Sequence, residues 1–247
     1  MGGRARLRHL FPFVTSELEA QDGDYSLSKI LCWGLLPPVW LSESPEEDLV
    51  AYCGTYLKEE IQAEALVRNL IGFSRFLTVA GLSNGTQLNY EALAKDCGVP
   101  ARHGKSRKPV ATSKLYFFDG GVARVLAGRP VPQPGSAEWG LALEHLIFQE
   151  LRAWLGYRNS QQPLCYWRTV DQREVDFIVG DELAIEVKAA ARINDRDLKG
   201  LRDLAHEATF KNRLLVCQEP EARMTEDGIL ILPVKQFLAR LWLGEWE

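Results

Sequence analysis

Two short apolar runs separated by a polar turn constrain the fold of this 247-residue chain most strongly. They are EVDFIV at 174–179 and LAIEVK at 183–188, and each carries charges inside a segment typical of a buried strand. Alternate residues of a strand share one face of a sheet. A three-residue loop at 180–182 would place Asp176 opposite Glu186 and Glu174 opposite Lys188, with all four charges on one face. A loop of two or four residues would separate Asp176 from Glu186.

The three-residue loop sets two carboxylates against each other. Directly opposed Cβ atoms lie ~5 Å apart. Two carboxylates at that spacing repel by ~1 kcal/mol in water and ~4 kcal/mol in a partly buried site. A bridging Mg²⁺ would relieve the repulsion, because it binds a few carboxylates, keeps its waters and meets phosphate. Lys188 would then orient a water or stabilise a phosphate. A protonated carboxyl or a solvated charged face is the competing interpretation.

A helix expected at 138–155 supplies a third carboxylate. Apolar residues flank Glu144 at i−3, i+3, i+4 and i+7, so its side chain is predicted to face the sheet. Glu150 has similar neighbours, and periodicity alone does not choose between the two glutamates.

The remaining elements of the C-terminal half predict a mixed sheet flanked by helices. Strands are expected at 114–118, 164–170, 173–179, 183–189, 213–218 and 228–234. Helices are expected at 120–128, 138–155, 194–208 and 235–244. This order indicates an α/β (α+β) architecture.

The N-terminal half is predicted to be helical from Pro45 onward, with little independent structure in the first forty residues. Ser44 is a plausible N-cap for a first helix, and a second helix stops at Ser83. The stretch 87–99 has the pattern of the first helix and turn of a helix-turn-helix. Pro100 and Pro109 leave no room for a recognition helix, so this unit is incomplete as a DNA reader.

A basic cluster follows that incomplete unit. It could contact nucleic-acid phosphates, although a solvated loop is the simpler interpretation, and it consists of Arg102, Lys105, Arg107 and Lys108. The HGKS stretch inside it is not a phosphate-binding loop, because Val99 stands where that motif needs glycine.

Composition excludes several classes of protein. The formal net charge is −4, so no global basic field would attract nucleic acid. Five dispersed cysteines are typical of reduced thiols in a cytoplasmic protein. No apolar run reaches the ~18 residues of a membrane span, and no membrane partner is expected.

The order of the candidate site residues resembles a known fold. A helix bearing Glu144, then Asp176, then Glu186-x-Lys188, resembles the PD-(D/E)XK, restriction-endonuclease-like fold. Almost the whole chain is similar to prokaryotic ATP-binding proteins that join an AAA+ ATPase module to a C-terminal domain of unknown function. The matching stretches include GGRARLRHLFPFVTSEL, YLKEEIQAEALVRN, SKLYFFDGGV, YWR, EVDFIV and AIEVK.

The resemblance implies three parts. They are a remnant of the end of an ATPase module at 1–43, a truncated winged-helix-like part at 44–113 and a nuclease-like domain at 114–247. It selects Glu144 over Glu150 as the helical carboxylate. It also implies that Asp176 and Glu186 bind Mg²⁺, that Glu144 assists, and that Lys188 positions water for phosphodiester hydrolysis of DNA. In this interpretation Glu174 pairs with Lys188 or orients it.

The chain departs from the family pattern at two places. Relatives carry their phosphate-binding loop and acidic ATPase motif before the stretch that begins here at Gly2, so no ATP site and no ATP hydrolysis are expected. Relatives also have a longer segment where this chain has residues 100–112. A short natural protein and a gene fragment both stay open, and so does a full-length ATPase relative as partner. The alternative function is a non-catalytic module for nucleic acid or protein with a vestigial site.

Overall fold

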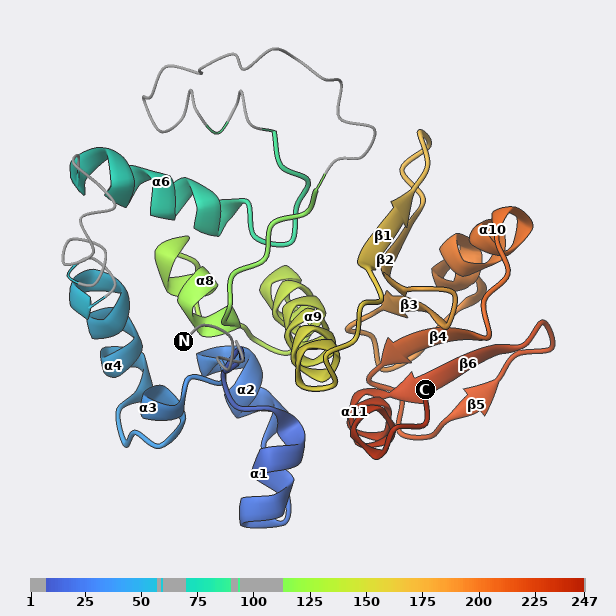
Figure 1. Ribbon diagram of the computed structural model, residues 1–247, viewed down its shortest axis with the longest axis horizontal. Helices are drawn as coiled ribbons and strands as arrows, with labels where there is room; N and C mark the ends of the chain where they lie inside the picture. The colour runs from blue at the N-terminus through green and yellow to red at the C-terminus, as the bar shows by residue number, and fades with distance from the viewer. Residues whose placement is uncertain (1–7, 57–58, 60–69, 90–92, 94–112, 247) are drawn as a thin grey trace, which may run out of the picture. The chain divides into compact units, whose positions relative to one another are not determined.

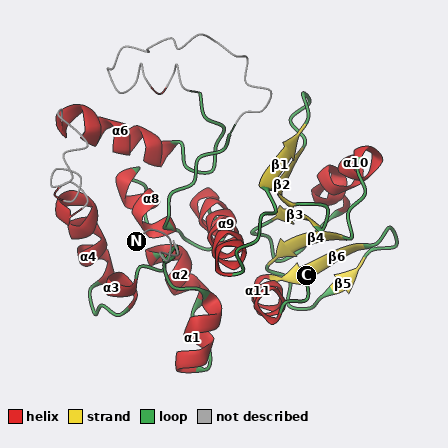
Figure 2. Ribbon diagram, viewed as in Figure 1, coloured by secondary structure: helices red, strands yellow, loops and turns green. Residues whose placement is uncertain are grey.

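The computed structural model describes residues 8–56, 59, 70–89, 93 and 113–246. The chain divides into two compact units, one formed by 1–25 with 147–247 and the other by 26–146. The first unit contains a six-stranded mixed sheet with helices, and the second is helical. The expected α/β class, a helical N-terminal region followed by a mixed sheet, is confirmed (Figures 1 and 2). The proposed division into parts at 1–43, 44–113 and 114–247 stays a prediction.

Short helices make up the second unit. They are α2 (Leu27–Trp33), α3 (Pro37–Trp40), α4 (Pro45–Ala51), the π-helix η1 (Tyr52–Tyr56), α6 (Leu70–Leu82), α8 (Gly120–Leu126) and the first half of α9 (Ala137–Tyr157). With α1 (Thr15–Asp22) of the first unit, they correct the expectation of little structure in the first forty residues. Most of these helices are shorter than the ~12–15 residues that an isolated helix needs, and tertiary packing of buried residues such as Leu18, Leu35 and Val39 stabilises them.

A buried aspartate joins two of these helices. Asp119 is the N-cap of α8 and accepts a hydrogen bond from Val122 N–H, 3.0 Å away. The same carboxylate accepts one from Leu35 N–H at 2.7 Å, just beyond the end of α2. Gly34 has φ +78°, and a side chain there would collide with this carboxylate. The strand expected at 114–118 is reduced to isolated bridges, Leu115 to Asn84 and Lys114 to Gln87.

Apart from the strand expected at 114–118, all the strands that the sequence predicts are present in the sheet of the first unit. The strands are β1 (Leu164–Arg168), β2 (Glu174–Val179), β3 (Leu183–Val187), β4 (Asn212–Cys217), β5 (Arg223–Met224) and β6 (Ile229–Pro233). Their spatial order is β1-β2-β3-β4-β6-β5. The first three strands are antiparallel, β3, β4 and β6 are parallel, and β5 is antiparallel to β6.

Helices cover both faces of this sheet, with α10 and α11 on opposite sides (Figure 1). The 3-10 helix η2 (Asp195–Leu198) and α10 (Lys199–Glu207) pack on one face, over a core that includes Val175, Ala184 and Leu215. On the other face Phe148 of α9 contacts Phe177, with ring centroids 6.4 Å apart. The helix α11 (Val234–Leu243) closes the described chain. Within the described ranges, no helix has the length and apolar character to cross a bilayer.

Candidate functional site

The hairpin between β2 and β3 has the predicted three-residue loop. Val179 pairs with Leu183 and Phe177 with Ile185, which confirms the predicted register. Gly180 has φ +50°, a left-handed conformation that favours glycine. The paired residues end at Phe177 and Ile185, so Asp176 and Glu186 are not ladder partners, contrary to expectation.

A β-bulge in β2 breaks the strict alternation on which the four-charge face was predicted. Cys165 of β1 pairs with Ile178 and Trp167 pairs with Val175, so two steps along β1 match three along β2. As a result Val175 packs in the same core as Ile178, beneath α10, instead of on the opposite face. The predicted common face of all four charges is therefore wrong.

Glu174 lies on the far side of the bulge from the β2–β3 ladder. Its cross-strand partner is Arg168, and the Arg168 Nη1 to Glu174 Oε2 distance is 3.2 Å. The predicted pairing of Glu174 with Lys188 is corrected, because the ammonium of Lys188 forms its ion pair with Glu186.

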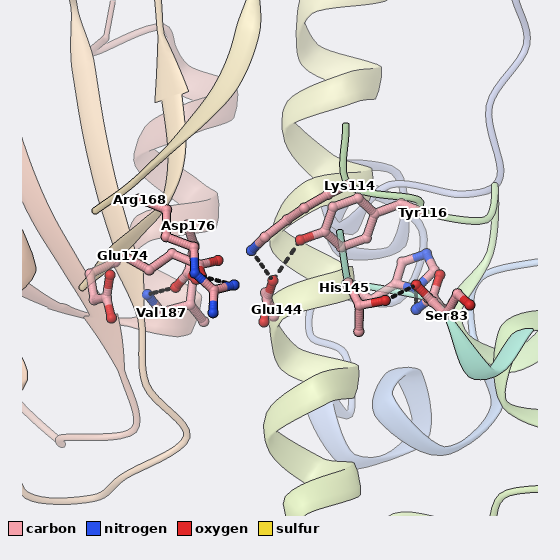
Figure 3. A network of polar contacts seen from close by, with 12 residues as sticks. Ser83, Lys114, Tyr116, Glu144, His145, Arg168, Glu174, Asp176 and Val187 are labelled. Carbon is pink, nitrogen blue, oxygen red and sulfur yellow. Dashed lines mark hydrogen bonds and ion pairs between the residues drawn. The ribbon is translucent and has the colours of Figure 1, made fainter. Parts of the chain in front are cut away.

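Asp176 and Glu186 are both buried, with 8% and 5% of their surface exposed. The backbone N–H of Val187 donates a hydrogen bond to Asp176 Oδ2 at 2.8 Å, as Figure 3 shows. The Asp176 carboxylate thus replaces a backbone acceptor for Val187 N–H just beyond the last β2–β3 pair, Phe177 and Ile185. It therefore lies beside the backbone of the residue that follows Glu186. This burial argues against the solvated charged face, since ionised side chains are seldom buried without charged or hydrogen-bonding partners.

Lys188 supplies the positive charge next to these acids. Its Nζ donates to Glu186 Oε1, and its backbone N–H donates to the Val216 carbonyl of β4 at 2.9 Å. Burial lowers the pKa of Lys188, but the charges of Glu186, Asp176 and Asp197 outweigh it and hold the pKa above its ordinary value. The Lys188 side chain is 37% exposed, which places its ammonium at the surface end of the site. Because its pKa is raised, the ammonium stays charged at neutral pH.

Glu144 belongs to the helical unit and has partners there. Tyr116 Oη donates to Glu144 Oε1 at 2.5 Å, and Lys114 Nζ lies 3.2 Å from the same oxygen (Figure 3). The next residue, His145, is packed between Asn84 and the Phe117 carbonyl, and burial lowers its pKa to about 4. The charge of Glu144 is therefore compensated by its own neighbours.

Glu150 is fully buried in the sheet-bearing unit, and the sequence gives no indication of its role. Thr15 N–H donates to Oε1 at 2.8 Å and Trp242 Nε1 donates to Oε2 at 2.6 Å. Burial raises the pKa of this carboxyl to about 7. Glu150 thus connects α1, α9 and α11, and its apolar helical neighbours were the only sequence signal of burial.

The basic residues Arg102, Lys105, Arg107 and Lys108 lie outside the described residues, as does most of the partial helix-turn-helix at 87–99. Among the described residues, no three His, Cys, Asp or Glu side chains come together as a metal-binding group. The candidate metal ligands are therefore the two carboxylates Asp176 and Glu186. Their hard oxygen atoms suit a Mg²⁺ ion that completes its shell with water and phosphate.

The class defined by these observations is an α/β protein with a helical N-terminal region and a buried acidic pair at the end of a hairpin. Residues 139–237 match a model described as a domain of unknown function (DUF4143), and residues 24–107 match a second domain of unknown function (DUF8612). Glu144, Asp176, Glu186 and Lys188 all fall within the first match. No curated protein and no solved structure matches the chain.

Proposed function

We propose that the sheet-bearing unit is a restriction-endonuclease-like domain that hydrolyses DNA phosphodiesters with Mg²⁺, in a relative of AAA+ ATP-binding proteins. The observation that carries the proposal is the burial of Asp176 and Glu186 where β2 and β3 part, with Lys188 beside them. Burying two carboxylates costs free energy unless counter-ions and hydrogen bonds compensate it. A fold that retains them despite this cost indicates that they serve a function. The order of Glu144, Asp176 and Glu186-x-Lys188 along the chain supports the same assignment.

In the proposed hydrolysis the acidic residues bind the metal ion and the lysine acts on the water and the phosphate. Asp176 and Glu186 would hold Mg²⁺, which when bound offsets the phosphate charge and lowers the pKa of a bound water. Lys188 orients the attacking water and places a positive charge beside the phosphate oxygens. The assisting role of Glu144 rests on its place in the sequence order alone, and Tyr116 and Lys114 contact its carboxylate within the helical unit.

Cleavage of supercoiled plasmid and of a labelled oligonucleotide in Mg²⁺ or Mn²⁺ tests the proposal. Asp176→Asn retains an acceptor for Val187 N–H but removes a charge, so it should fold and lose cleavage. Lys188→Ala should lose cleavage as well. Glu182→Gln is the matched control, because Glu182 lies in the hairpin loop and pairs with the exposed Lys211. Equal cleavage by all four proteins would refute the assigned site.

A non-catalytic module is the second candidate. The observation that favours it is that the protein already supplies partners for both acids, Lys188 for Glu186 and Val187 N–H for Asp176. A folded protein that cuts no substrate with any metal, yet retards DNA in a gel-shift assay, would support this alternative.

A further inference from the structure

The Lys188 ammonium occupies the carboxylate oxygen of Glu186 that a metal ion would need as a ligand. Its Nζ is bound to Glu186 Oε1, and Asp176 and Asp197 also act electrostatically on the ammonium. Of the acids in this group, Glu186 and Asp176 are the two that the protein buries. The lysine thus offers a positive charge to both buried acids.

We propose that Lys188 is the resident counter-ion of the Asp176–Glu186 pair, and that a divalent metal binds by displacing the ammonium from Glu186. This inference rests on the proposed function, because it takes the two carboxylates as the metal ligands. It makes Lys188 a residue that sets metal affinity, in addition to its role beside the phosphate.

Three properties of the site support displacement. A carboxylate oxygen that accepts from an ammonium is poorly placed to coordinate a dication, and the like charges of the two cations repel. The lysine stem is flexible and its side chain is 37% exposed, so the ammonium can turn toward solvent. The backbone of Lys188 is fixed to β4 through the Val216 carbonyl, so the ammonium can leave Glu186 without movement of the strand.

Displacement couples metal binding to substrate binding. A phosphate group offers the released ammonium a new partner, so nucleic acid lowers the free-energy cost of moving Lys188 off Glu186. By linkage, metal and nucleic acid then increase each other's affinity. The site would load its metal fully only with a phosphodiester present.

Mn²⁺ binding measured by the loss of the free-ion EPR signal tests the inference without any cleavage. Lys188→Gln should bind Mn²⁺ at least about tenfold more tightly than the wild type, because the competing cation is removed. Lys188→Arg retains the charge and should stay as weak as the wild type. Lys211→Gln removes an equal charge from the exposed Lys211–Glu182 pair and should change nothing. Adding Asp176→Asn to Lys188→Gln should abolish the gain.

A titration with Mg²⁺ followed by NMR of the lysine Nζ groups separates displacement from a general charge effect. The Lys188 signal should shift or broaden as its ion pair opens, and the Lys211 signal should not. If the wild type binds Mn²⁺ and Lys188→Gln binds it no more tightly, displacement is wrong while the metal site stands. If no variant binds Mn²⁺, both the displacement and the proposed metal-dependent function are overturned.

Discussion

Glu150→Gln should abolish the loss of stability that the Glu150 carboxyl causes in the wild-type protein as the pH rises from 4.5 to 7. The Glu150 carboxyl is fully buried, and burial raises its pKa from the ordinary 4.5 to about 7. An acid with a raised pKa binds its proton more tightly in the folded state than in the unfolded state. Its contribution to stability is therefore complete below pH 4.5 and is lost as the pH rises to 7.

The magnitude follows from the same two values. One pH unit between folded and unfolded pKa corresponds to ~1.4 kcal/mol, so the Glu150 carboxyl accounts for ~3 kcal/mol across this range. The amide that Glu150→Gln introduces does not titrate, but it presents a donor to either Thr15 N–H or Trp242 Nε1–H. That mismatch costs ~1–3 kcal/mol at every pH. Because the amide does not titrate, the dependence of the free energy of unfolding on pH no longer contains a contribution from residue 150.

His145 must be considered in the assay, since it titrates with the opposite sign. Burial lowers its pKa from 6.5 to about 4, so its contribution is present above pH 6.5 and is lost as the pH falls through 4. The two slopes oppose each other in the wild type between pH 4.5 and 6.5. The difference between wild type and Glu150→Gln cancels the His145 contribution and isolates that of Glu150.

Urea denaturation of both proteins at half-unit steps from pH 4.5 to 8 gives the required difference. The free energy of unfolding of the wild type, minus that of Glu150→Gln, should fall by ~3 kcal/mol over this range. A difference that stays constant within error would show that Glu150 titrates normally. A difference that rises with pH would show that the bonds from Thr15 and Trp242 outweigh burial.

Two further predictions concern the supports of the fold. Asp119→Ala removes the acceptor of Leu35 N–H and Val122 N–H and should destabilise the helical unit by ~2–4 kcal/mol, measured by thermal denaturation; an unchanged melting temperature would contradict the role given to Asp119. Deleting residues 1–25 removes the Thr15 N–H donor to Glu150 and should increase hydrogen exchange at α11. Exchange at α11 equal to that of the full chain would show that the N-terminal segment does not support the sheet-bearing unit.

The sequence predicts the hairpin well, because its evidence is local. Alternation of apolar residues and the Gly180-Asp181-Glu182 turn determine the register, which the structure confirms. The bulge in β2 escapes prediction, since one unpaired residue reverses the faces without any change in composition. The two-residue strand β5 gives no periodicity to detect.

The partners of the buried acids could not be predicted, because they are distant in sequence or belong to the backbone. Glu150 and Glu144 have nearly equal helical surroundings, and only the contacts with Thr15 and Trp242 show that Glu150 is structural. The partner of Asp176 is the Val187 N–H, which no side-chain pattern reports.

Nicking of supercoiled plasmid in Mg²⁺, with wild type and Asp176→Asn compared at equal concentration, tests the central claim most directly. That claim is our proposal that the buried Asp176 and Glu186 form a metal site for phosphodiester hydrolysis. Wild type should nick the plasmid, EDTA should stop it, and Asp176→Asn should be slower by about a hundredfold or more. Nicking that persists undiminished in Asp176→Asn, or a wild type that never nicks, would contradict the claim.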